Sequence, residues 1–130
     1  MTAAPLRTVG VASEEDSSRI ELPGRQWGLL LGPANVGAAN MTLGFSIFPA
    51  GSAPSGHTHP AEEEMIYVLS GRGQIITDAV VVDLRPGLAV YIPPGLHHAT
   101  AADDDEPLHL LTAFSPPVIP GSYEPPASND

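Results

Sequence analysis

The chain has 130 residues, with 15 acidic against 5 basic side chains and a formal net charge of −10. It contains no cysteine and no lysine, which excludes disulfides, thiolate metal sites, thiol catalysis and Schiff-base chemistry. Such an acidic chain is repelled by nucleic acid and by anionic membrane surfaces, so we expect neither as a partner. There is no apolar run long enough to span a membrane and no secretory signal pattern at the start, so we expect one cytoplasmic domain.

The order of the chain predicts strands and almost no helix. Residues 1–18 are small and polar, and we expect them to form a flexible N-terminal arm. From residue 19 to 115, Pro and Gly recur at short intervals between segments rich in β-branched, aromatic and Leu residues, which favours strands. The expected strands are 26–31, 41–48, 65–69, 74–76, 80–84, 88–92 and 108–114. This pattern is typical of an all-β sandwich or barrel.

One expected strand and the end of the chain raise the question of what covers the barrel. Segment 65–69 is apolar on both faces, so its outer face needs cover from an N-terminal strand or from a second subunit. We therefore expect a homodimer. The Pro-rich tail, residues 116–130, is unsuited to a central strand. It is expected either to be disordered or to fold over the barrel mouth through Tyr123.

Four of the five histidines lie in two tight clusters that suggest a metal site. In an extended strand His57 and His59 point to the same side, and a returning strand would bring Glu64 beside them. His98 follows a rigid Pro-Pro-Gly turn. Three imidazoles and one carboxylate suit Fe(II), Mn(II), Ni(II) or Zn(II), and they leave positions open for a catalytic metal.

The remaining histidines have simpler interpretations. His97 must point away from its neighbour His98 if the strand is extended, so we treat it as a non-ligand. His109 lies in an apolar strand and is either an ordinary sheet histidine or a residue that faces the substrate.

The spacing of these residues resembles the two motifs of the cupin superfamily, G(X)5HXH(X)3-4E(X)6G and G(X)5PXG(X)2H(X)3N. The first motif matches at every fixed position between Gly51 and Gly71. The second, which begins at Gly87, matches at four of five positions and departs at Ala102, where the family has Asn. The resemblance implies an antiparallel jelly-roll β-barrel of six to eight strands. It also implies one divalent metal per chain inside the barrel, held by His57, His59, Glu64 and His98.

The resemblance leaves the reaction open, because one fold hosts many functions. Segment 41–48 carries no charge on either face, and the only basic residues are five arginines. Phosphorylated sugars are therefore disfavoured, and a small apolar or aromatic molecule with a metal-binding oxygen fits better. We expect a dioxygenase-type oxidoreductase in which Glu64 acts as a base. Weaker candidates for the substrate pocket are Phe45, Ile66, His109 and Tyr123.

Two alternatives remain. The first is a metal-dependent lyase, isomerase or cyclase. The chain resembles the small cupin lyases that cleave dimethylsulfoniopropionate, but it has Ile66 where they carry a catalytic Tyr, while Tyr123 could match a second Tyr of theirs. The second alternative is a non-catalytic module that binds or senses a small molecule.

Overall fold

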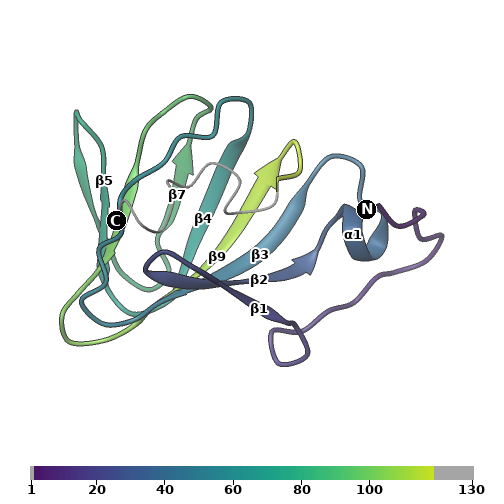
Figure 1. The fold of residues 1–130 in the computed structure, drawn as a ribbon, viewed down its shortest axis with the longest axis horizontal. Helices are drawn as coiled ribbons and strands as arrows, with labels where there is room; N and C mark the ends of the chain where they lie inside the picture. The colour runs from purple at the N-terminus through teal and green to yellow at the C-terminus, as the bar shows by residue number, and fades with distance from the viewer. Residues whose placement is uncertain (1, 119–130) are drawn as a thin grey trace.

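The computed structural model describes residues 2–118, which form antiparallel strands and one short helix (Figure 1). The structural elements, in chain order, are β1 (Arg19–Leu22), β2 (Arg25–Leu31), α1 (Pro33–Val36), β3 (Thr42–Phe48), β4 (Glu63–Ser70), β5 (Gly73–Ile76), β6 (Val81–Leu84), β7 (Ala89–Ile92), β8 (Ala99–Ala102) and β9 (Leu108–Ser115).

The strands form two sheets, and the predicted all-β jelly roll is confirmed. The larger sheet has the order β1-β2-β3-β9-β4-β7, and the smaller has the order β6-β5-β8. Figure 1 shows β3, β9, β4 and β7 side by side, with β5 in the other sheet. Nine strands lie within residues 2–118, more than the six to eight expected. The added strands are β1, a largely exposed edge strand, and β8, whose sequence ATAA lacks the bulky residues that mark strands.

The hydrophobic core lies between the two sheets. In β4 and β9 the side chains alternate between buried and more exposed positions, as a sheet packed on one face requires. The core side chains come from both sheets: Phe48, Ile66, Val68, Ile75, Leu84, Ile92, Ala102, Leu108 and Leu110. The inner faces of β2, β3, β4 and β9 extend beyond this core and line the space beside the candidate site, whose histidines lie outside the named strands.

The outer face of the large sheet is covered only in part. The segment before β1 has no strand or helix, and it contacts the sheet through Glu14, whose Oε1 is 2.7 Å from Nε2 of His109. On β4, Met65 and Tyr67 are exposed, with 59% and 45% of their surface accessible. A second subunit over this outer face of β4 stays a prediction.

Two further predictions concern the ends of the chain and the membrane. The expected closure of the barrel mouth by the tail through Tyr123 concerns residues that lie outside the described range. Among residues 2–118, no helix has both the length and the apolar character needed to cross a membrane.

Candidate metal centre

Backbone hydrogen bonds join the two histidine-bearing segments. His57 and His98 form an isolated antiparallel bridge, in which each N–H donates to the other's carbonyl at 2.9 and 3.0 Å. The N–H of Gly95 donates to the carbonyl of His59 at 2.8 Å. A Cβ at Gly56 would lie 2.5 Å from the carbonyl oxygen of His98, so only glycine permits this close approach. The bridge therefore fixes the relative positions of the three histidines.

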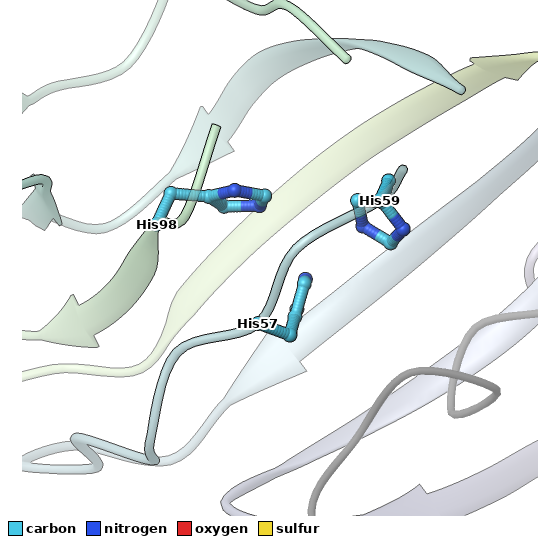
Figure 2. A group of neighbouring side chains, drawn as sticks. All are labelled: His57, His59 and His98. Atoms are coloured by element: carbon cyan, nitrogen blue, oxygen red, sulfur yellow. The ribbon is translucent and has the colours of Figure 1, made fainter. Parts of the chain in front are cut away.

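The three imidazole rings surround a common space (Figure 2). The ring centroid of His57 is 4.7 Å from that of His59 and 4.7 Å from that of His98. One ring nitrogen from each residue can be chosen so that all three lie within 4.8 Å of one another. Donors on opposite sides of one ion at about 2.1 Å would be roughly 4.2 Å apart, so this grouping is close to what a shared ion requires.

Glu64 brings a carboxylate to the same place. It projects from the inner face of β4, and its Oε1 lies 3.4 Å from Nε2 of His98 and 3.7 Å from Nε2 of His59. Glu64 is 6% exposed, and its Oε1 accepts no hydrogen bond from any residue in the described range. A buried carboxylate oxygen in this position is costly unless a cation or a proton satisfies it.

The protonation of the cluster also suits metal binding. Burial lowers the pKa of His59 below its usual value of 6.5; the Glu64 carboxylate opposes this effect, while His57 and His98 add to it. The Nδ1 of His98 lies 3.0 Å from the carbonyl oxygen of Leu96. Since a carbonyl only accepts, Nδ1 carries a proton, which leaves Nε2, on the side of Glu64, as the ring nitrogen that can bind a metal.

These observations together test whether a metal fits. A divalent ion needs imidazole nitrogens and a carboxylate oxygen within reach of one point. The described residues supply three imidazoles, of which His59 and His98 are buried and His57 is half-buried, and Glu64 supplies an adjacent buried carboxylate oxygen. The histidines can therefore hold a metal ion. His97, expected to be a non-ligand, is exposed and lies outside this group.

A small chamber of about 30 Å³ adjoins the cluster. It has room for an ion and a few waters only. Its lining comprises Arg25, Trp27, Ser46, Phe48, His57, His59, Glu64, Ile66, His98, Thr100, Leu110, Thr112 and Phe114. All of these residues except His57 and Thr100 are buried, so groups in the chamber are largely shielded from bulk water.

The predicted pocket residues fall in different places. Ile66 lines the chamber, and its part in a substrate pocket stays a prediction. Phe45 and His109 do not line it, which corrects our expectation for both residues. They contact each other edge to face, with ring centroids 6.1 Å apart, on the side of the sheet where Glu14 meets His109. Successive side chains of a strand point to opposite faces of the sheet. Since Ser46 and Leu110 line the chamber, Phe45 and His109, which precede them, lie on the other face. Tyr123 lies outside the described residues.

Sequence reasoning missed Arg25 and Trp27, which line the chamber from β2. Both are more than nine-tenths buried. Their i, i+2 spacing placed them on one face, but nothing in the sequence distinguished the inner face of this strand from the outer one.

Comparison with known proteins establishes the family. Residues 44–114, more than half of the chain, match the family model described as the cupin domain. This chain belongs to the cupin family.

Among its curated relatives, this cupin is 33% identical over 87 residues to the polyketide synthase protein CurC of Streptomyces cyaneus. The match covers 67% of the chain and 56% of CurC, so the cupin spans little more than half the length of that relative. The dimethylsulfoniopropionate lyase DddW of Ruegeria pomeroyi is 33% identical over 79 residues, covering 59% of this chain and 50% of the lyase.

Among solved structures, the polyketide cyclase RemF of Streptomyces resistomycificus superposes with a TM-score of 0.73 at 20% identity. The superposition covers 83% of this chain and 80% of RemF. At this identity the likeness supports the fold and says nothing by itself about the reaction.

Proposed function

We propose that this cupin is a metal-dependent enzyme that catalyses lyase- or cyclase-type chemistry, without consuming O₂, on a small, largely apolar molecule bearing an oxygen. The single observation that carries the proposal is the set of three clustered imidazoles, two of them buried, with Glu64 Oε1 3.4 Å from His98 Nε2. Support also comes from the relatives, because CurC and RemF are described as polyketide proteins and DddW as a lyase. None of these three is described as an oxygenase, so the dioxygenase prediction has less support.

Each residue of the site has a role in this proposal. His57, His59 and His98 hold the ion and Glu64 completes its ligand set. When bound, the ion supplies Lewis-acid polarisation of a carbonyl or enol oxygen. The Glu64 carboxylate is also the base that can take a proton from the carbon next to that carbonyl, because its burial keeps water from competing for the carboxylate.

Within the proposal, Ile66 favours cyclisation over a tyrosine-assisted lyase reaction. Its side chain is 3% exposed and lines the chamber, at the position where the small cupin lyases that this chain resembles carry a catalytic Tyr. An alkyl group neither accepts nor donates a proton, so in this proposal proton transfer is assigned to Glu64, the carboxylate among the described residues that line the chamber. A wall of Ile66, Phe48 and Phe114 excludes water from reactive intermediates.

The test uses protein reconstituted separately with Fe(II), Mn(II), Ni(II) and Zn(II) and a panel of aromatic β-diketones and phenols. Products are identified by mass spectrometry with and without O₂. The proposal predicts anaerobic turnover of at least one compound, with products that keep the mass of the reactant or lose the mass of water or another small leaving group. His98→Ala should abolish the turnover, and His97→Ala should retain it.

Two results would contradict the proposal. Products that form only with O₂ and gain the mass of oxygen atoms would support the dioxygenase instead. Stoichiometric metal binding without turnover of any compound on the panel would favour the non-catalytic binding module.

A further inference from the structure

A second, larger space lies beside the chamber on the same face of the large sheet. This cleft has a volume of about 380 Å³, an order of magnitude above the 30 Å³ of the chamber. It falls in the range typical of small-molecule sites, roughly 300 to 1,000 Å³. Its lining includes Ile20, Trp27, Leu29, Pro33, Thr42 and Val118.

The inner row of β2 links the two spaces. Arg25 lines the chamber, Leu29 lines the cleft, and Trp27 lies between them and lines both. The indole packs over Gly44 of β3, where a Cβ would lie 2.2 Å from Cζ2. The missing side chain at Gly44 therefore makes room for Trp27 to form the wall shared by the chamber and the cleft.

The lining of the cleft defines the chemistry of its ligand. None of its lining residues is charged, although the chain as a whole has a net charge of −10. The hydroxyls of Thr2, Ser18 and Thr42 are the polar side-chain groups in this lining apart from the indole. Such a wall suits a neutral ring system with one or two oxygens, since burying an unpaired charge there would be costly.

We propose that this cleft binds the apolar ring body of the ligand, and that Trp27 is the specificity-determining residue that limits how large a ring can approach the metal chamber. This inference rests on the proposed function for the identity of the ligand as substrate. The size of the two spaces supports it, because the chamber has room for an ion and a reactive oxygen but not for a ring.

The first experiment measures binding of 1-naphthol by isothermal titration calorimetry, to both the metal-loaded and the chelator-treated protein. Ala34→Phe places a ring in the cleft from the exposed face of α1. The matched control is Ala79→Phe, which adds the same ring at an exposed turn position between β5 and β6. We expect saturable binding by the wild type, at least tenfold weaker binding by Ala34→Phe and unchanged binding by Ala79→Phe.

The second experiment tests the role of Trp27. Trp27→Leu opens the wall between the spaces, so the ratio of affinities for 9-phenanthrol and 1-naphthol should rise at least fivefold. Far-ultraviolet circular dichroism and metal content confirm that this variant and Ala34→Phe stay folded and loaded.

Two results would overturn the inference. One is absence of saturable 1-naphthol binding by the wild type, or equal binding by wild type and Ala34→Phe. The other is an unchanged affinity ratio in folded Trp27→Leu. Binding of 1-naphthol to the chelator-treated protein tests the cleft without the metal, so its result does not depend on the proposed catalytic function. Loss of turnover with intact cleft binding contradicts only the catalytic proposal.

Discussion

Replacing Gly44 by alanine should destabilise the fold, although the same change in an open strand position would stabilise it. Gly44 does not have the positive φ that only glycine adopts readily, so its backbone conformation accepts alanine. Alanine also reduces the conformational entropy of the unfolded chain, which by itself would stabilise the fold by about 0.4 to 1 kcal/mol. The new Cβ would lie 2.2 Å from Cζ2 and 2.5 Å from Cε2 of Trp27, and 2.8 Å from the carbonyl oxygen of Gly28. None of these atoms belongs to the flexible end of a side chain.

Overpacking of this kind costs about 1 to 3 kcal/mol, which exceeds the entropic gain. The net expectation is a loss of about 1 to 2 kcal/mol, or a fall in Tm of roughly 3 to 8 °C. Urea unfolding followed by circular dichroism measures the loss. Because Trp27 is the only tryptophan, its fluorescence directly reports displacement of the indole.

Two comparisons isolate the cause. Gly87→Ala introduces strain at φ +88°, but its Cβ has no neighbour closer than the Tyr67 hydroxyl at 4.0 Å, so it should destabilise without altering Trp27 emission. In a double-mutant cycle, Trp27→Leu should remove at least about 1 kcal/mol of the cost of Gly44→Ala. A Gly44→Ala protein as stable as the wild type, with unchanged emission, would refute the packing of Trp27 on Gly44.

Three further outcomes are expected. Glu14→Ala should lower stability by less than about 1 kcal/mol, because its pair with His109 is partly exposed; a larger loss in urea unfolding would mean that the N-terminal segment is held more firmly. The predicted homodimer should sediment as a dimer at micromolar concentration and dissociate in the Met65→Glu/Tyr67→Glu variant, whereas a monomeric wild type would exclude it. The metal-free protein should lose stability as pH falls below about 6.5, because burial lowers the pKa of His59 in the folded state and the unfolded chain therefore binds that proton first. The free energy of unfolding, measured from pH 7 to pH 5, should fall in the wild type and stay flat in His59→Gln. Identical pH profiles for the two proteins would contradict this.

The sequence predicted the histidine cluster better than the pocket around it. Local spacing accounts for His57 and His59 lying together, and the cupin motifs added His98, which the structure groups with them. Even so, spacing alone did not show the backbone bridge between His57 and His98, which depends on the pairing of segments far apart in the chain.

The inner and outer faces of β3 could not be assigned from the sequence. Both alternating sets of this strand are free of charge, so the pattern left open which set faces the interior. The structure places Thr42 and Ser46 inward, and Phe45 is buried on the other face beside His109. A phenylalanine buried on the outer face, beneath Arg19 of β1, has the same sequence signature as one that lines a cavity.

The measurement that tests the central claim most directly is the metal content of protein purified without chelator and with any histidine tag removed. Inductively coupled plasma mass spectrometry should find close to one equivalent of a divalent transition metal in the wild type and in His97→Ala, and almost none in folded His98→Ala. Folded wild-type protein that takes up no Fe(II), Mn(II), Ni(II) or Zn(II) on reconstitution would contradict the claim. So would a full equivalent of metal in His98→Ala.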